Sequence, residues 1–208
     1  MRDLPRRAAR EIGVRAGRLR PSYRRRARFN LQDQDDPSWQ RRAERAVDMW
    51  ASEGPVGDRG GTMSIADFGC GNERLRDVLA DRLSDPFNYQ GYDLEPQSPT
   101  AIKLDLQHEL PDRTFDLGFT LGVLEYLEDV EAFLRRLGRV AGFAITTYVI
   151  SDSPDRLTET ERLGRGWRSH YSREGFAELC RTTGWMTLDF ELIDDGRTGL
   201  WLLRSTLR

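Results

Sequence analysis

Apolar runs and amphipathic stretches alternate along most of the chain, which predicts strands and helices in turn. Five runs predict strands: the mostly apolar Met63–Phe68, Ala101–Leu104, Phe115–Leu121 and Val140–Ile150, and the more polar Asn88–Asp93. Two stretches between these runs predict helices, at Asn72–Leu83 and Leu127–Leu137. Strands that alternate with helices are typical of a parallel sheet covered by helices on both faces.

The last part of the chain predicts one more helix and a hairpin. Ser172–Thr183 is expected to be helical, and Trp185–Ile193 and Gly199–Arg204 are expected to pair across the turn "DDGRT". The predicted fold class is therefore α/β. It is a doubly wound, mostly parallel, Rossmann-like seven-stranded sheet that ends in an antiparallel β-hairpin and carries an N-terminal helical extension.

That extension is expected to contain two helices. A basic helix is predicted from Pro5 to about Arg20, where Pro21 ends it. A second helix should begin with Asp36 as its N-cap and Pro37 at its first position. Its apolar residues recur at helical spacing and should pack on the body of the protein, at Trp39, Ala43, Ala46, Val47 and Trp50.

Charge divides the chain into a basic arm and an acidic body. Residues 1–28 hold eleven arginines against Asp3 and Glu11, a net charge of +9, so the overall −2 leaves −11 for residues 29–208. One interpretation is that the arm contacts an anionic membrane or an anionic polymer. The alternatives are a tail enriched in arginine by genomic composition, or a helix that packs on the acidic body of its own or another subunit.

Composition also limits the class of protein. No segment approaches the roughly 18 apolar residues of a membrane helix, and no signal-peptide core follows Met1. The two cysteines, Cys70 and Cys180, lie far apart and give neither metal-ligand spacing nor a disulfide framework. We therefore expect a cytoplasmic protein without a metal site.

The stretch "TMSIADFGCGNERL" places two glycines directly after the first predicted strand. Gly69 and Gly71 allow the backbone to approach a ligand closely at the carboxyl end of that strand. A dinucleotide fingerprint fails because Arg74 occupies its third glycine position, and no G-K-[ST] of a P-loop follows. Asp67 would place negative charge beside the turn, so a cationic ligand without phosphate fits better.

These residues resemble the first motif of class I S-adenosylmethionine-dependent methyltransferases. "IADFGCGNE" is similar to the family's D-x-G-x-G turn, and "YQGYDL", "KLDL" and "FDLGFTLGVLEYLED" follow in the family's order. The resemblance implies that residues 36–208 form a methyltransferase domain behind an arm of residues 1–35. Within it, we expect a covering helix at 36–54, a cofactor-binding half at 63–150, and an acceptor-side half with the terminal hairpin at 151–208.

The resemblance also implies the roles of individual residues toward S-adenosylmethionine. Asp67 and the amides around Gly69 and Gly71 would hold the methionyl end, and Asp93 would accept hydrogen bonds from the ribose hydroxyls. The adenine ring would lie between Leu94 and Leu106 with its amino group on Asp105, and the sulfonium would lie beside Leu121 and Gly122. The complete predicted cofactor set is Asp67, Gly69, Cys70, Gly71, Asp93, Leu94, Asp105, Leu106, Leu121 and Gly122. Cys70 is expected to be a small buried residue of this turn.

The sequence departs from the family pattern in two places. Glu73 stands where many members have another glycine. The interval between Asp93 and Asp105 is too short for a full helix between the second and third strands, and Pro96 and Pro99 lie within it. This shortening is similar to a compact bacterial type of methyltransferase domain.

Residues near the expected acceptor side offer three candidate catalytic groups. His170, in "RLGRGWRSHYSREGF", is a candidate base near neutral pH, but the stronger alternative is a structural role beside the helix cap at Ser172. Trp167, Arg168 and Tyr171 of the same stretch are candidates for a lid or for contacts with an anionic acceptor. Glu125 and Tyr126 follow the fourth strand and are expected to face the same mouth.

Motifs for several acceptor classes are missing. There is no D/N-P-P-Y/F tetrapeptide, no Pro-Cys nucleophile, and only a single lysine, Lys103. We therefore expect no DNA or RNA substrate, and a small-molecule or glycan or lipid-linked acceptor that is methylated at oxygen or nitrogen. The alternative is a non-catalytic methyltransferase-like protein that acts as the partner of another biosynthetic enzyme.

Overall fold

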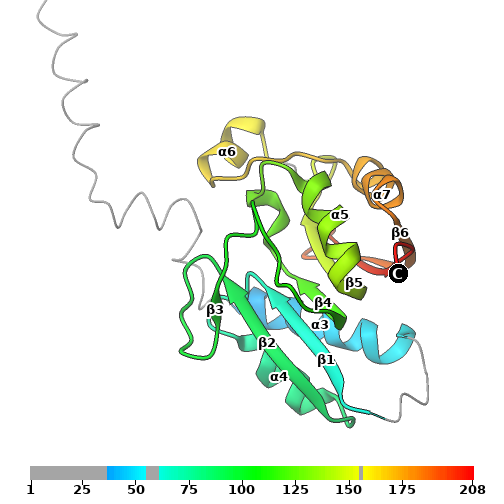
Figure 1. The fold of residues 1–208 in the computed structure, drawn as a ribbon. Helices are drawn as coiled ribbons and strands as arrows, with labels where there is room; N and C mark the ends of the chain where they lie inside the picture. The colour runs from blue at the N-terminus through cyan, green and yellow to red at the C-terminus, as the bar shows by residue number, and fades with distance from the viewer. Residues whose placement is uncertain (1–36, 55–60, 155–156) are drawn as a thin grey trace, which may run out of the picture.

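The computed structural model describes residues 37–54, 61–154 and 157–208 (Figure 1). The predicted arm helix from Pro5 to Arg20 and the predicted N-cap Asp36 lie outside these residues. None of the helices in the described ranges is long and apolar enough to cross a membrane.

A seven-stranded sheet forms the centre of the protein, with the order β3-β2-β1-β4-β5-β7-β6 (Figure 1). Its strands are β1 (Met63–Phe68), β2 (Phe87–Asp93), β3 (Ile102–Lys103), β4 (Phe115–Thr120), β5 (Ala141–Val149), β6 (Trp185–Ile193) and β7 (Thr198–Ser205). The first five strands pair in parallel, whereas β7 pairs antiparallel with both β5 and β6. The predicted α/β sheet and its terminal hairpin are confirmed, and β7 inserts between β5 and β6.

Helices cover both faces of the sheet. Those described are α3 (Pro37–Glu53), α4 (Arg74–Arg82), α5 (Val130–Val140), α6 (Glu159–Gly164) and α7 (Arg173–Thr182), with one turn of 3₁₀ helix at Leu124–Tyr126. Four of the five residues predicted to pack on the body, Ala43, Ala46, Val47 and Trp50, are buried against α4 and the sheet, whereas Trp39 is only partly buried.

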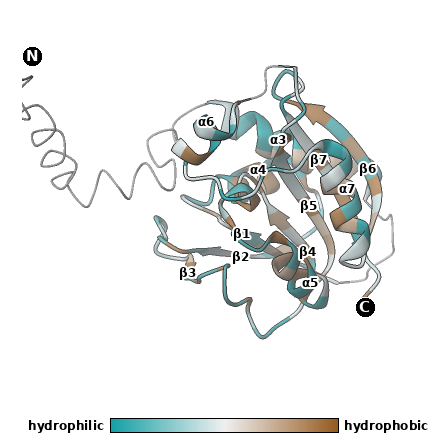
Figure 2. Cartoon of the chain, turned by 90° about the horizontal axis from the view of Figure 1, so that it is seen from above, coloured by the Kyte–Doolittle hydropathy of each residue, from teal (hydrophilic) through white to brown (hydrophobic). Residues whose placement is uncertain are grey.

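Side chains that alternate along the strands pack into two separate hydrophobic cores, one on each face of the sheet. On β1, Phe68 is fully buried with Phe133 of α5 and Phe176 of α7, whereas Ile65 is buried with the residues of α3 and α4. Successive residues of a strand point to opposite faces, so a strand in the middle of such a sheet must be apolar on both. Figure 2 colours both hydrophilic and hydrophobic residues along α7, a helix that buries Phe176, Leu179 and Cys180.

Local capping explains where the helices begin. The Asp129 side chain accepts a 2.8 Å hydrogen bond from the Ala132 amide, so α5 starts at Val130 and not at the predicted Leu127. The capping box that Thr158 forms with Glu161 starts α6, a helix that the sequence analysis did not predict. The short interval between β2 and β3 contains only turns and bends, as expected from its prolines.

Candidate functional site

The turn after β1 requires glycine at its first position. Gly69 has φ +84°, and a Cβ atom there would lie 2.0 Å from Cγ2 of Val123. Gly71 also has a positive φ, of 52°. Only a residue without a side chain adopts this conformation at such close approach without strain. The turn therefore lies directly against the segment that follows β4.

A cavity of about 230 Å³ opens beside this turn at the carboxyl ends of β1, β2 and β4. All ten residues of the predicted cofactor set line it: Asp67, Gly69, Cys70, Gly71, Asp93, Leu94, Asp105, Leu106, Leu121 and Gly122. The side chains of Trp39, Arg74 and Gln97 also contribute to its wall. Residues predicted from four separate segments are thus brought together in one place, where open α/β sheets bind ligands.

Asp93, the last residue of β2, is anchored by backbone amides. Its Oδ2 atom accepts a 2.9 Å hydrogen bond from the Gly71 amide, and its Oδ1 atom accepts one of 2.8 Å from the Glu95 amide. Burial raises the pKa of Asp93 and the bond from Gly71 opposes this rise. Each oxygen retains a second lone pair, so the carboxylate is held rigidly as an acceptor for two ligand hydroxyls.

Asp67 supplies a buried negative charge at the floor of the cavity. Its side chain accepts a 2.7 Å hydrogen bond from the Tyr89 hydroxyl and only 4% of the residue is exposed. The pKa of Asp67 is raised to about 7, mainly by burial and also by the nearby carboxylates of Asp93 and Glu73, against the hydrogen bond from Tyr89. A carboxylate with this environment is stabilised in its charged form by a cation, because the cation offsets both burial and repulsion.

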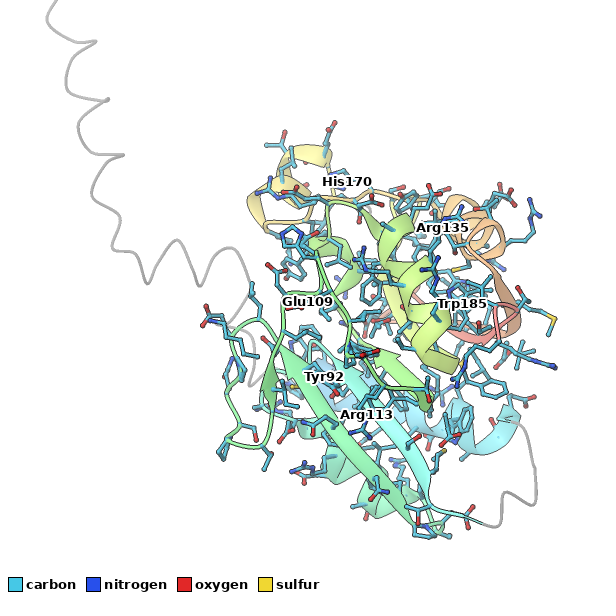
Figure 3. The ribbon with its side chains drawn as sticks, in the orientation of Figure 1. Tyr92, Glu109, Arg113, Arg135, His170 and Trp185 are labelled. Carbon is cyan, nitrogen blue, oxygen red and sulfur yellow. The ribbon has the colours of Figure 1, made fainter. Side chains whose placement is uncertain are left out.

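The amides of the turn are less available than the sequence analysis assumed. Gly69 and Cys70 both donate their amide hydrogens to the Tyr92 carbonyl, at 2.7 and 3.1 Å, and Gly71 donates to Asp93. Tyr92 is labelled on β2 in Figure 3. These three amides are therefore already used within the protein, whereas the carboxylates of Asp67 and Asp93 can still accept hydrogen bonds from a ligand. The Cys70 thiol is buried, which raises its pKa, in keeping with a packing role.

Glu73 occupies the family's glycine position in a left-handed conformation, with φ 62°. This backbone costs a non-glycine residue about 1–2 kcal/mol. The buried side chain is held by hydrogen bonds from the hydroxyls of Ser98 and Thr100 in the short β2–β3 connection. The glutamate therefore ties that shortened connection to the glycine turn.

The opposite end of the cavity combines apolar and acidic side chains. Leu106 is buried, whereas the side chain of Asp105 is 40% exposed and accepts a 3.0 Å hydrogen bond from the Gln107 amide. This arrangement suits a flat ring with an exocyclic donor group, as the sequence analysis proposed for these two residues.

A second and larger cavity, of about 690 Å³, adjoins the first. Its wall is formed by α3, the end of β5, α6 and the β6–β7 turn, and Trp39, Gly122 and Tyr126 line both cavities. A Cβ atom at Gly122 would lie 2.5 Å from the Trp39 ring, so the indole rests directly on this glycine. Trp39 was predicted only to pack on the body of the protein, and no residue of α6 was predicted to line a cavity.

Two of the three predicted catalytic residues line the larger cavity. Glu125 is 1% exposed, and its Oε1 atom accepts a 2.7 Å hydrogen bond from the Val149 amide. Its Oε2 atom has no hydrogen-bond partner among the described residues. Burial raises the pKa of Glu125, whereas Arg42 and Arg162 oppose this rise. Burial likewise raises the pKa of Tyr126 to about 12, against a hydrogen bond with Trp167.

His170, the third predicted catalytic residue, lines neither cavity. It lies near α6 in Figure 3, and its Nδ1 atom is buried without a hydrogen-bond partner in the described part of the chain. Burial lowers its pKa. A role of His170 as base stays a prediction that this placement does not support. In residues 37–54, 61–154 and 157–208, no group of His, Cys, Asp and Glu side chains could hold a metal ion.

Similar folds occur in solved methyltransferase structures. Burkholderia thailandensis 1,6-didemethyltoxoflavin-N1-methyltransferase is 17% identical with a TM-score of 0.64, over 98% of this chain and 93% of that one. A chain from the complex of the Haloferax volcanii Trm112 methyltransferase activator with a methyltransferase is 16% identical, with a TM-score of 0.66 over 90% and 99%. Magnesium protoporphyrin IX methyltransferase from Synechocystis PCC 6803 is 15% identical, with a TM-score of 0.58 over 80% and 83%.

The strand order of the sheet is that of the Rossmann-like methyltransferase fold, and the acid-lined cavity lies at the ligand-binding edge of this fold. Residues 66–142 match the family model described as a methyltransferase domain. Residues 66–142 accordingly form a methyltransferase domain of the class I type that uses S-adenosylmethionine. No curated protein matches it in sequence.

Proposed function

We propose that the protein transfers a methyl group from S-adenosylmethionine to an oxygen or nitrogen atom of a small-molecule or glycan-type acceptor. The observation that carries this proposal is the junction of the two cavities at Gly122 and Tyr126. A methyl donor in the smaller cavity and an acceptor in the larger one would meet there. Two structural neighbours are methyltransferases named after small molecules, didemethyltoxoflavin and magnesium protoporphyrin IX, which supports a small-molecule acceptor.

The ten residues that line the smaller cavity are proposed to bind the cofactor. Asp67 would hold the methionyl ammonium, and Asp93, fixed by the amides of Gly71 and Glu95, would orient the ribose. When bound, the cofactor supplies an electrophilic methyl group. The chain's own contribution is then to position the acceptor in line and to exclude water.

Proton removal from the acceptor is assigned to Glu125 or Tyr126. Glu125 has the stronger claim because burial raises the pKa of its carboxyl group, which makes the group more basic. Burial raises the pKa of the Tyr126 hydroxyl to about 12, so this group is better suited to donate a hydrogen bond near neutral pH.

The proposal is tested with the full chain in two steps. Calorimetry with S-adenosylhomocysteine first measures cofactor-site binding, with Asp93→Ala as the matched loss-of-site variant. Formation of S-adenosylhomocysteine from S-adenosylmethionine is then followed over a panel of hydroxyl and amine acceptors. Turnover that disappears in Asp93→Ala supports the proposal.

Two outcomes would contradict the proposed function. Tight binding of S-adenosylhomocysteine without turnover on any acceptor would favour the alternative, a cofactor-binding partner of another biosynthetic enzyme. If S-adenosylhomocysteine does not bind at all, the assignment of the smaller cavity is wrong.

A further inference from the structure

Arginine is concentrated around the larger cavity. Six arginines line it, at Arg41, Arg42, Arg45, Arg162, Arg165 and Arg197. Four carboxylate residues share the lining, at Glu125, Glu191, Asp194 and Asp195. The lining therefore carries a formal charge of +2 when all these groups are ionised, although residues 29–208 carry −11. A positive cavity in an acidic body raises the local concentration of anions.

Three of these arginines are neutralised locally. Each pairs with a carboxylate that lines the same cavity: Arg42 with Asp194 at 2.5 Å, Arg45 with Glu191, and Arg197 with Asp195 at 3.8 Å. They hold α3 and the β6–β7 turn in place around the cavity. The charge that is left over belongs to the other three, Arg41, Arg162 and Arg165.

Arg162 is a buried cation that pairs directly with no described carboxylate, although the charges of Glu125 and Asp152 act on it from a longer distance. Only 1% of the residue is exposed, and its Nη2 atom donates to the carbonyls of Val149 at 3.1 Å and Ile150 at 2.6 Å. Its Nε and Nη1 atoms are buried and have no acceptor within the described ranges. No carboxylate of these ranges lies within ion-pair distance. A buried charge left in this state is costly unless a ligand completes its hydrogen bonds.

Trp167 holds two of the arginines on one side of the cavity. The guanidinium carbons of Arg162 and Arg165 lie 5.5 and 5.6 Å from the centre of its ring. Arg165 is exposed and, like Arg162, has no ion-pair partner among residues that the structure describes. Because Arg162 is fixed by two carbonyls and both arginines lie over the indole, the donors are preorganised for a planar or tetrahedral anion.

This cluster is separate from the cofactor cavity and yet within reach of it. None of Arg41, Arg162 and Arg165 lines the smaller cavity, so they are not placed to hold the methionyl carboxylate. Tyr126, which lines both cavities, hydrogen-bonds to Trp167. Trp167 and Tyr126 thus connect the arginines to the point where the two cavities meet.

We propose that the methyl acceptor carries an anionic group, a carboxylate or a phosphate, which binds to Arg162 and Arg165 beside Trp167. This inference deepens the proposed function and rests on it. The anionic group anchors the acceptor at the α6 wall of the larger cavity, and the hydroxyl or amine that receives the methyl group extends past Tyr126 toward Gly122. The three aromatic side chains of the lining, Trp39, Tyr126 and Trp167, provide apolar contact for the body of the acceptor.

The test uses the full chain saturated with S-adenosylhomocysteine. Inorganic phosphate, benzoate and uncharged benzamide are titrated into it by calorimetry. The expected result is binding of at least one of the two anions and weaker binding of benzamide than of benzoate. The comparison of phosphate with benzoate shows whether the cluster favours a phosphate or a carboxylate.

Variants locate the anion. Arg165→Gln is exposed and should fold normally, and we expect it to weaken anion binding about 10-fold, as expected for loss of one charged hydrogen bond. Arg162→Gln should weaken binding about 10- to 100-fold, with its melting temperature recorded alongside. Arg139→Gln, an exposed arginine of α5 outside both cavities, is the matched control and should leave binding unchanged.

Two results would overturn the inference. One is the absence of anion binding by wild-type protein that binds S-adenosylhomocysteine normally, which leaves the proposed function intact. The other is an equal loss of affinity in Arg139→Gln and Arg165→Gln, which would assign the anion to general surface charge. Failure of S-adenosylhomocysteine itself to bind would instead count against the proposed function.

Discussion

Cofactor affinity should depend on pH through Asp67. Burial and the neighbouring carboxylates raise the pKa of this group to about 7 in the protein without ligand. If Asp67 holds the cofactor's ammonium, only its ionised form binds, so affinity must fall as the pH drops below that pKa. The ammonium itself stays mostly protonated up to about pH 7.5, because α-amino groups titrate at about 7.7–8.0.

The size of the effect follows from a single titrating group. With a pKa of about 7, roughly one molecule in eleven is ionised at pH 6 and about three in four at pH 7.5. The dissociation constant should therefore be about eightfold larger at pH 6 than at pH 7.5. Asp67→Asn, which keeps a hydrogen-bond acceptor for Tyr89, should bind about 10- to 100-fold more weakly and lose this dependence.

The charge of Asp67 should also affect the stability of the folded protein, and a second measurement tests this effect. Since the folded pKa of Asp67 lies above the unfolded value of about 3.9, its contribution to stability is present below pH 4 and is lost as the pH rises through 7. Asp67→Asn should thus raise the melting temperature of the ligand-free protein at pH 8. The stabilisation reaches up to about 4 kcal/mol, at roughly 1.4 kcal/mol per pKa unit.

Calorimetry with S-adenosylhomocysteine from pH 6 to 7.5 and thermal melts at pH 4 and pH 8 make the two measurements. A dissociation constant that is flat across this range in wild type would refute the assignment of Asp67. So would the same slope in Asp67→Asn and wild type, because the titrating group would then be another one.

Three further substitutions have defined outcomes. Asp93→Ala should weaken S-adenosylhomocysteine binding by about 1.5–3 kcal/mol through loss of charge-assisted hydrogen bonds, and an unchanged dissociation constant by calorimetry would exclude Asp93 from the site. Gly69→Ala forces a Cβ atom to within 2.0 Å of Val123 at φ +84°, so it should lower stability by about 1–3 kcal/mol in denaturant titrations. The control Gly164→Ala meets nothing within 4 Å and should be neutral or stabilising by up to about 1 kcal/mol. Trp39→Ala should weaken binding to both cavities, and a loss confined to one would show that the indole is not shared as described.

The sequence predicted which residues line the smaller cavity, because each of them lies in a short motif at the end of a strand. The sequence shows two glycines after an apolar run and acids at or just after the next strands. Because these strands are parallel, their carboxyl ends meet at one edge of the sheet, which brings Asp67, Asp93 and Asp105 together. The prediction went wrong on the amides, because sequence does not show that the Tyr92 carbonyl already accepts two of them.

The acceptor side could not be predicted in the same way. Its wall joins α3 to α6 and the β6–β7 turn, which both lie more than a hundred residues after α3 in the chain. Arg162 has no local signal because a single arginine in an arginine-rich chain is unremarkable until its burial is seen. For α6 the sequence does contain a signal, because the capping-box spacing of Thr158 and Glu161 indicates the start of a helix.

The indole of Trp39, shared by both cavities and seated on Gly122, has a consequence for kinetics. Whichever ligand arrives first immobilises the ring, so the second enters a chamber whose boundary is already set and loses less entropy on binding. Each ligand should then raise the affinity of the protein for the other by the same factor, whichever of the two is bound first. Calorimetric titration of an acceptor with and without S-adenosylhomocysteine would measure this factor.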